Sequence, residues 1–169
     1  MTRETTARAV RIARATVDDA GGILQCVSEA FEPYRTQYTP AAFNDTVMTD
    51  ETVRERIETM IVLVARNDAS LIVGTIGAAV RGAEGHLRGM AVAPFAQGGA
   101  VADDLLRSIE SELTDAGCSY VTLDTTAPLT RAMRFYERNG YVRSGTVSDF
   151  FGMVLYEYRK QLRGPVARV

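Results

Sequence analysis

Residues 86–113 read HLRGMAVAPFAQGGAVADDLLRSIESEL, and this stretch decides the fold. Its first part, residues 87–92, is apolar enough for a strand, and Pro94 opens a turn after it. A loop of small residues follows, and apolar residues then recur at helical spacing, namely Val101, Leu105, Ile109 and Leu113. The sequence therefore predicts a strand that feeds a loop and then a helix.

The loop at the start of this helix is a candidate anion site. Residues without bulky side chains let a ligand approach the backbone, and the first amide N–H groups of a helix have no partner inside it. The positive end of the helix dipole adds to their attraction for phosphate-like groups. We expect the anion to bind at six consecutive residues, Gln97, Gly98, Gly99, Ala100, Val101 and Ala102.

Length and composition fit an ordinary globular protein. The 169 residues suit one domain over 1–169, with a core at about 10–160 and frayed ends. Hydrophobic residues make up 46% of the chain and charged residues 24%, which is typical of a packed domain. The net charge of −2 and the lack of a basic run give little support to nucleic-acid binding.

The chain shows no targeting or metal-binding pattern. Its first ten residues lack the apolar core of a signal peptide, and no apolar run approaches the roughly 18 residues of a membrane helix. We therefore expect a cytoplasmic protein that does not bind membranes. Cys26 and Cys118 have neither a metal-ligand neighbour nor the density of a disulfide framework, so we expect buried, reduced thiols and no metal site.

Strand and helix patterns alternate along the rest of the chain. Apolar runs predict strands at residues 10–13, 60–65, 71–80, 85–92, 120–124, 141–143 and 151–158. Helices are expected at residues 16–31, 50–58 and 98–116, in a shorter segment opened by Thr126 and Pro128 and ended by Asn139, and as a second helix or lid within 32–50. Short turns imply antiparallel neighbours, whereas the helix at 98–116 implies one parallel crossover. The fold class is α+β (mixed α/β), with a mixed, mostly antiparallel central sheet of six to seven strands flanked by helices.

Two separated signatures resemble the GNAT superfamily of acetyl-CoA-dependent N-acetyltransferases. Val92-Ala93-Pro94 and the loop that starts at Gln97 resemble the pyrophosphate loop of the family. Residues 132–141, AMRFYERNGY, resemble its Ala-x-x-Phe-Tyr-Glu-x-x-Gly-Tyr helix. The order of strands and helices fits as well, so the resemblance implies a GNAT-like three-layer fold over nearly the whole chain.

This resemblance implies acetyl-CoA as the cosubstrate and no metal. The loop would hold the pyrophosphate, and the pantetheine arm would run along the strand that ends at Val92, which splays from the strand at 120–124. The Val92 N–H would polarise the thioester carbonyl. The expected cofactor-binding residues outside the loop are Met90, Ala91, Val92, Ala132 and Phe135. Ala100 stands where the family usually has Gly, and Asp103 and Asp104 would repel a pyrophosphate unless they point away.

The same resemblance suggests two catalytic residues. Tyr136 matches the family tyrosine beside the thioester sulfur and would act as the general acid; the alternative is a core phenol with a hydrogen bond. His86, the only histidine, lies six residues before Val92, where some family members place a catalytic Glu, and would act as the general base. A solvent-exposed histidine at a strand start is the alternative, and Glu84 or water could replace it as the base.

The acceptor is expected to be a primary amine of a small molecule or peptide that attacks acetyl-CoA directly in a ternary complex. Its site falls to the segment 31–50, with Tyr34 and Tyr38, and to the late strands around 149–153; plain packing of these aromatic residues is the alternative. The second function hypothesis is a noncatalytic acyl-CoA-binding or regulatory domain, suggested by Ala100, Asp103 and Asp104. A homodimer agrees with the habit of the family.

Overall fold

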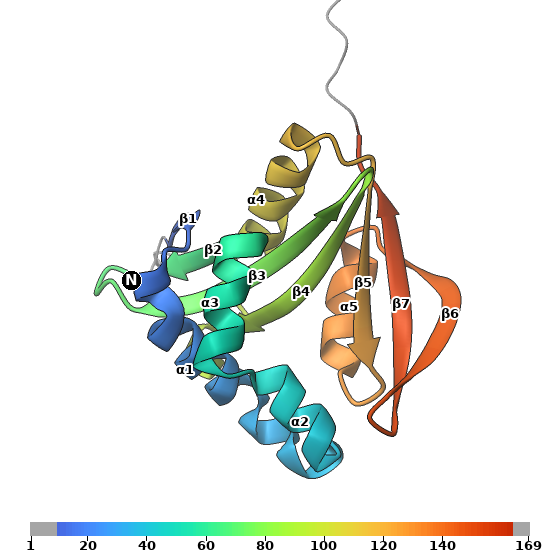
Figure 1. Ribbon diagram of the computed structural model, residues 1–169, viewed down its shortest axis with the longest axis horizontal. Coiled ribbons are helices and arrows are strands. Elements are labelled where there is room, and N and C mark those ends of the chain that lie inside the picture. Colours follow the sequence, from blue (N-terminus) through green and yellow to red (C-terminus); the bar gives the residue numbers. More distant parts are fainter. Residues whose placement is uncertain (1–9, 164–169) are drawn as a thin grey trace, which may run out of the picture.

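A single mixed sheet organises the computed structural model, which describes residues 10–163 (Figure 1). Its seven strands follow the order β1-β2-β3-β4-β5-β7-β6, and within the described residues β4 and β5 form the one parallel pair. The predicted mixed, mostly antiparallel sheet flanked by helices is therefore confirmed. The expected frayed ends lie outside the described residues, apart from Arg163.

The strands lie close to their predicted positions. They are β1 (Arg11–Arg14), β2 (Ile61–Arg66), β3 (Ile72–Arg81), β4 (Glu84–Val92), β5 (Tyr120–Thr126), β6 (Val142–Phe150) and β7 (Met153–Gln161). The prediction for β6, three residues at 141–143, was wrong in length, since the strand has nine residues. Its side chains are exposed almost throughout, so it carries no alternation of buried and exposed residues from which a strand could be recognised.

The helices also follow the prediction, although those expected from residues 16, 98 and 126 start later. They are α1 (Ala20–Phe31), α2 (Pro40–Val47), α3 (Asp50–Thr59), α4 (Val101–Asp115) and α5 (Thr130–Arg138), and short 3-10 turns occupy η1 (Val17–Asp19), η2 (Glu32–Gln37) and η3 (Pro94–Ala96). The helix expected from residue 98 begins only at Val101, because Gly98 has a φ of 81°, outside the helical range. The helix expected from Thr126 begins at Thr130, because Thr126 still pairs with Leu155 of β7.

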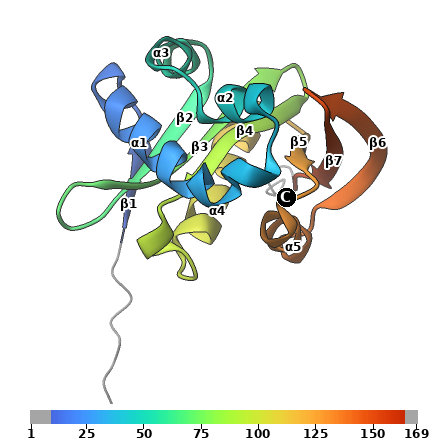
Figure 2. The ribbon, with the colours of Figure 1, turned by 90° about the horizontal axis from the view of Figure 1, so that it is seen from below.

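Helices cover both faces of the sheet (Figures 1 and 2). On one face, α1 and α3 bury Val27 and Val53 against Val62 and Val64 of β2. The opposite face is covered by α4 and α5, which pack on a cluster that includes Leu63, Leu87, Leu105, Ile109 and Tyr136. None of the helices described is long and apolar enough to cross a membrane.

Two glycines let α4 lie close to the sheet. A Cβ at Gly74 of β3 would lie 2.8 Å from Leu105 Cδ1, and one at Gly85 of β4 would lie 2.6 Å from Leu113 Cδ1. Real Cβ atoms essentially never come so close, so a larger residue at either position would force the leucine side chain to shift. Gly74 thereby holds the N-terminal part of α4 against β3, directly after the loop that the sequence marks as an anion site, and Gly85 holds its C-terminal end against β4.

The strands β4 and β5 separate halfway along their length (Figure 1). Their parallel ladder ends at the pair Leu87 and Leu123, after which β4 stays with β3 and β5 with β7. A bulge in β4 lies just beyond this point: Arg88 pairs with Gly77, and the next pair in the ladder is Ala91 with Thr75. Gly89, in the bulge, has a φ of 67°. The splay that the resemblance implied is confirmed, and it leaves an unpaired length of β4 backbone.

Candidate active site

Tyr136 reaches the opening between β4 and β5 from α5. Its side chain is buried, and its hydroxyl donates a hydrogen bond to Sδ of Met90 at 3.2 Å. Burial raises the pKa of the Tyr136 phenol well above its usual value, so the hydroxyl stays protonated near neutral pH. The rings of Phe135 and Tyr141 hold it from two sides, with centroids at 5.2 and 5.6 Å. Such a side chain is a fixed proton donor beside the unpaired part of β4.

A partly buried polar group lies next to Tyr136, on the far side of the Tyr141 ring. The hydroxyl of Tyr141 donates to Glu110 of α4 at 3.0 Å, and the ammonium of Lys160 on β7 lies 2.9 Å from each oxygen of the same carboxylate. Burial and the neighbouring Glu110 charge both raise the pKa of Tyr141. This group ties α4 to β7 under α5. Sequence reasoning missed it, because its three members come from segments far apart in the chain.

The side chain of Gln97 ties the predicted pyrophosphate loop to both β4 and α5. Its Nε2 donates to the Val92 carbonyl at 2.9 Å, and its Oε1 accepts from Nη1 of Arg131 at 3.1 Å. The Ala100 backbone, with φ −84° and ψ −2°, has an ordinary right-handed conformation. Alanine in place of the usual family glycine therefore adds no backbone strain here.

The two aspartates at the start of α4 are engaged by neighbouring side chains. Asp104 forms an ion pair with Arg107 at 2.6 Å. Asp103 accepts from the Asn139 amide at 3.3 Å and lies 3.9 Å from Arg138. Both carboxylates are thus paired with side chains from outside the loop, while Arg131 adds a positive charge beside it. Sequence reasoning missed Arg131. It directly precedes the motif that starts at Ala132, and this position could have indicated it.

The backbone of β4 offers a free donor at the opening. The Ala93 N–H donates to the Val73 carbonyl of β3 at 2.8 Å. Neighbouring residues of a strand direct their N–H groups to opposite sides, so the Val92 N–H points away from β3 toward β5. Ala91 is buried on the α1 side, where its carbonyl lies 4.0 Å from Cys26 Sγ. Of the other expected cofactor residues, Ala132 and Phe135 lie partly buried on α5 against the same core as Met90 and Val92.

His86 lies at the base of the opening, on the opposite face of the sheet. Its Nδ1 is 2.7 Å from Thr122 Oγ1, which in turn lies 2.5 Å from a Glu84 carboxylate oxygen. The carboxylate can only accept, so the hydroxyl of Thr122 donates to it and Nδ1 donates to Thr122. This tautomer leaves Nε2 free to accept a proton, at 3.4 Å from Asp124 Oδ2. The side chain of His86 is only 12% exposed, so the alternative of a solvent-exposed histidine was wrong.

Sequence reasoning missed Thr122 and Asp124 as partners of His86. Both occupy alternate positions in YVTLD, and the parallel register pairs His86 with Thr122. The predicted crossover between the two strands was a signal that could have found them, because it places one strand beside the other. Within the described residues, no cluster of three or more His, Cys, Asp or Glu side chains could hold a metal ion.

The expected acceptor segment packs on the same face as His86. Tyr38 is buried, and its hydroxyl lies 2.6 Å from Thr126 Oγ1 at the end of β5. Its ring contacts Phe31 and Phe43, with centroids 6.3 Å from each, and Tyr34 packs beside Phe31. Packing, the open alternative, therefore accounts for Tyr38 in this structure, and a contact of Tyr34 or Tyr38 with the acceptor stays a prediction.

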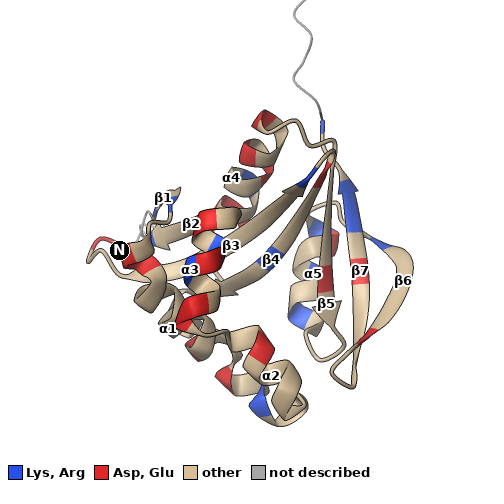
Figure 3. Cartoon of the chain, in the orientation of Figure 1, with Lys and Arg blue, Asp and Glu red and all other residues tan. Residues whose placement is uncertain are grey.

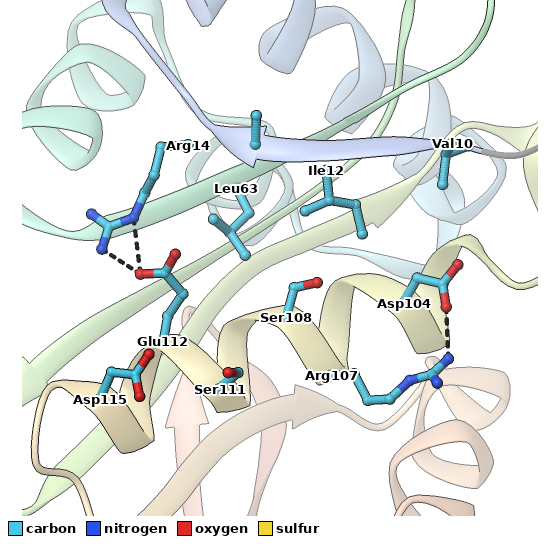
Figure 4. Close-up of a pocket in the computed structure, with 11 residues that line it drawn as sticks. Val10, Ile12, Arg14, Leu63, Asp104, Arg107, Ser108, Ser111, Glu112 and Asp115 are labelled. Carbon is cyan, nitrogen blue, oxygen red and sulfur yellow. Dashed lines mark hydrogen bonds and ion pairs between the residues drawn. The ribbon is translucent and has the colours of Figure 1, made fainter.

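An open groove of about 630 Å³ lies elsewhere, between β1 and α4 (Figure 4). Its walls include Ile12, Ser108 and Ser111, and an ion pair between Arg14 and Glu112 crosses it at 2.5 Å. None of the loop or catalytic residues named above lines it. The candidate site is thus the opening in the sheet rather than this groove.

Comparisons with known proteins agree with this geometry. A model of the acetyltransferase (GNAT) family matches residues 23–141, whereas no curated protein matches the sequence. An N-acetyltransferase, PaiA, from Thermoplasma acidophilum, solved with coenzyme A, has a TM-score of 0.76 at 16% identity, covering 88% of this chain and 98% of its own. The fold is shared with a GNAT-family acetyltransferase from Staphylococcus aureus, at a TM-score of 0.75 and 16% identity over 92% and 100% of the two chains. The ribosomal-protein-S18-alanine N-acetyltransferase from Escherichia coli gives 0.75 at 15% identity over 95% and 99%. Because the family model spans most of the residues, the chain belongs to the acetyltransferase (GNAT) family.

Proposed function

We propose that this acyltransferase moves an acetyl group from acetyl-CoA to a primary amine of a small molecule or peptide by direct attack in a ternary complex. One observation carries the proposal. The unpaired part of β4 has a buried proton donor, Tyr136, on one face and a proton acceptor, His86, at its base on the other. A direct transfer needs both, since the amine must lose a proton and the leaving thiolate must gain one.

The residues present suit acetyl-CoA, which supplies the acetyl group as a thioester. The six loop residues from Gln97 to Ala102 offer helix-start amides for its pyrophosphate, and Arg131 offers a neutralising charge. The edge of β4 that faces the opening offers the backbone groups of Met90 and Val92 to the pantetheine arm, whereas Ala91 pairs with Thr75 of β3. Ala132 and Phe135 contribute apolar surface from α5.

The Val92 N–H acts on the acetyl carbonyl in this proposal. It points into the opening and has no ladder partner there, because β5 has already turned away. A fixed donor of this kind stabilises the negative charge that develops on the oxygen during attack. Gln97 supports it by holding the Val92 carbonyl.

His86 removes the proton from the ammonium group of the acceptor. Thr122 and Glu84 fix the proton on Nδ1 and keep Nε2 free for this purpose. Asp124 lies near Nε2, where it attracts the ammonium and stabilises the imidazolium once the proton has moved. The neutral amine then attacks the thioester carbonyl, the C–S bond breaks, and Tyr136 donates its proton to the departing sulfur. The second proton that the attacking nitrogen releases restores the Tyr136 hydroxyl. Burial keeps its pKa high, so the proton is present at neutral pH.

The noncatalytic alternative loses its main support. It rested on repulsion between the pyrophosphate and Asp103 and Asp104, yet both carboxylates are engaged by other side chains. Ala100, the third departure from the family pattern, has unstrained backbone angles.

The test is thiol release from acetyl-CoA over a panel of primary amines, with His86→Gln and Tyr136→Phe as the variants. We expect release with at least one amine, lowered at least tenfold in each variant, and a higher melting temperature with acetyl-CoA. A rise in melting temperature without thiol release from any amine would favour the noncatalytic alternative. If acetyl-CoA neither raises the melting temperature nor reacts, both readings fail.

A further inference from the structure

The guanidinium of Arg56 reaches from α3 over the bulge in β4. Its Nη1 lies 3.0 Å from the point where a Cβ at Gly89 would stand, and the Met48 side chain approaches the same point. A side chain at position 89 would therefore displace Arg56. The bulge and this glycine together bring a partly buried cation onto the sheet just beyond Leu87, the last residue of β4 that pairs with β5.

This cation has no counter-charge in contact. Among residues 10–163, neither Arg56 nor Arg88 makes a side-chain hydrogen bond or an ion pair, whereas Arg54 on the same helix pairs with Asp50 at 2.6 Å. Burial lowers the pKa of Arg56, and the charge of Arg88 lowers it further, against weaker opposing effects of Asp45 and Glu55. Two like charges, one of them partly buried, are costly to hold together. Such a cost is common where a site awaits an anion.

Both arginines face the side of the sheet that carries His86. Gly85 faces α4, so His86 and Arg88 face the other way, as does Gly89, whose missing side chain leaves room for Arg56. Two residues of a strand span roughly 7 Å, which is the length of a small amino acid or aminoalkyl phosphate. The anion site and the proposed base thus lie one small acceptor apart.

The opposite side of the opening carries negative charge. Asp124 of β5 lies 3.4 Å from Nε2 of His86 and pairs directly with Glu157 of β7, so the two carboxylate side chains lie on one face. At this level of the sheet, Figure 3 shows basic colour on β4, whose one arginine or lysine is Arg88, and acidic colour on β5 and β7. At this level the opening has arginine on β4 and α3 and carboxylates on β5 and β7, while Glu84 of β4 and Arg159 of β7 lie further along the same face.

We propose that Arg56 and Arg88 bind an anionic oxygen group of the acceptor, so that the acceptor is a small amine that also carries a carboxylate or a phosphate. This inference rests on the proposed acetyl transfer and names its substrate class. Asp124 and Glu157 receive the ammonium end beside His86, and the two guanidinium groups receive the anionic end, for which their planar forks are suited. An acceptor with both charges fits both halves of the face, whereas a simple alkylamine fits only one.

Matched pairs of amines test the proposal in the thiol-release assay. Each pair shares one skeleton with and without the anion: β-alanine and β-alaninamide for the carboxylate, and O-phosphoethanolamine and ethanolamine for the phosphate. We expect at least one anionic member to exceed its partner in kcat/KM at least tenfold. Arg56→Gln and Arg88→Gln should raise KM for that amine at least tenfold and change kcat little. For the neutral partner, KM and kcat should stay within twofold of the wild-type values. Arg54→Gln is the control and should change neither.

A measurement without turnover separates the two proposals. The ¹⁵N signal of Arg56 Nε is followed while the same four amines are titrated into the protein with coenzyme A present. A shift that saturates with an anionic amine and not with its neutral partner supports the anion site even without thiol release, which would count against acetyl transfer alone. Thiol release without preference for the anionic members, or an equal loss for both members in Arg56→Gln, would overturn the anion site and leave the transfer reaction standing. An unchanged Arg56 signal in all four titrations would likewise overturn it.

Discussion

The hydroxyl of Tyr136 donates to the Met90 thioether across the opening between β4 and β5, at 3.2 Å. A thioether is a weak acceptor, so this buried phenol gains little stability from its hydrogen bond. Its neighbour Tyr141 instead donates to the Glu110 carboxylate at 3.0 Å. Two tyrosines whose rings meet edge to face are thus held in opposite ways, one by a weak partner at the site and the other by a charged partner in the scaffold.

Removing each hydroxyl should have opposite effects on rate and stability. Tyr136→Phe is expected to change the free energy of unfolding by less than about 1 kcal/mol and to lower kcat about 100-fold, because a weak hydrogen bond and a proton donor are lost. Tyr141→Phe should lower the free energy of unfolding by about 1.5–3 kcal/mol, the range for hydrogen bonds to charged groups, and keep kcat within a few-fold. Thermal unfolding and thiol release measure the two quantities. Wild-type turnover in Tyr136→Phe would remove Tyr136 from the mechanism.

Thr122 and Thr125, three residues apart on β5, provide a second matched pair. Thr122→Val leaves Nδ1 of His86 and the Glu84 carboxylate without their shared hydroxyl, so kcat/KM should fall at least tenfold, and Thr122→Ser should restore it. The Thr125 hydroxyl is buried and makes no hydrogen bond among the described residues. Thr125→Val should therefore keep activity and raise the free energy of unfolding by about 1 kcal/mol.

The pH profile distinguishes catalysis from packing at His86. If His86 is the base, the acidic limb of kcat/KM should change shape or position in Thr122→Val and vanish in His86→Gln. The same acidic limb in His86→Gln as in the wild type would assign the base to another group, with Glu84 or water as the remaining candidates.

Local patterns predicted the parts of the fold that are locally encoded. The helix α4 follows from its apolar spacing, and Gly117 ends it, with a φ of 88° directly after the last turn. The length of β6 was underestimated because its apolar residues Val142 and Val147 are exposed. A strand with one buried face would have shown alternating apolar and polar residues. The start of α5 was misplaced because Pro128 reads as a helix opener, although β5 continues to Thr126.

The candidate site divides in the same way. Gln97 and Tyr136 belong to contiguous motifs, so the sequence alone identified them. Asp124 joins His86 only through the parallel register of two strands, and Arg131 joins Gln97 only through the packing of α5 on the loop. Arg56 was beyond sequence reasoning, because its approach to β4 depends on a bulge at Gly89 that no periodicity reveals.

Both cysteine thiols should react slowly in the folded protein. Burial raises the pKa of Cys26 to about 11 and also raises the pKa of Cys118. A raised thiol pKa means that little thiolate is present at pH 7.5, and both side chains are buried as well. A disulfide reagent should label neither cysteine within minutes in buffer and both in denaturant. Fast labelling of either thiol in the native protein would contradict this, and the thiol-release assay would then need a correction for it.

Loss of the Arg131 charge should weaken the binding of acetyl-CoA and leave the chemical step unchanged. Its guanidinium lies beside the loop through Gln97, so Arg131→Gln is expected to raise KM for acetyl-CoA several-fold at unchanged kcat and to weaken the dependence of KM on salt. Arg134, one turn further along α5, is exposed and makes no side-chain hydrogen bond or ion pair with any residue in the described range 10–163, so Arg134→Gln is the control. Equal changes in the two variants would indicate a general charge effect instead of a specific contact.

Arg56 and Arg66 should respond in opposite ways to the loss of their charge. Arg66 of β2 pairs with Asp19, whose carboxylate is nearly buried and also accepts from the Thr16 N–H. Arg66→Met strands that carboxylate and should lower the free energy of unfolding by roughly 1–3 kcal/mol, discounted for the partial exposure of the pair. Arg56→Met removes a partly buried cation that has no partner and is repelled by Arg88, so the melting temperature should stay unchanged or rise. Thermal unfolding of both variants at low salt decides the matter. A clear fall in the melting temperature of Arg56→Met would mean that the guanidinium supports the fold. The lack of a counter-charge at Arg56 would then no longer indicate a site for an anionic ligand.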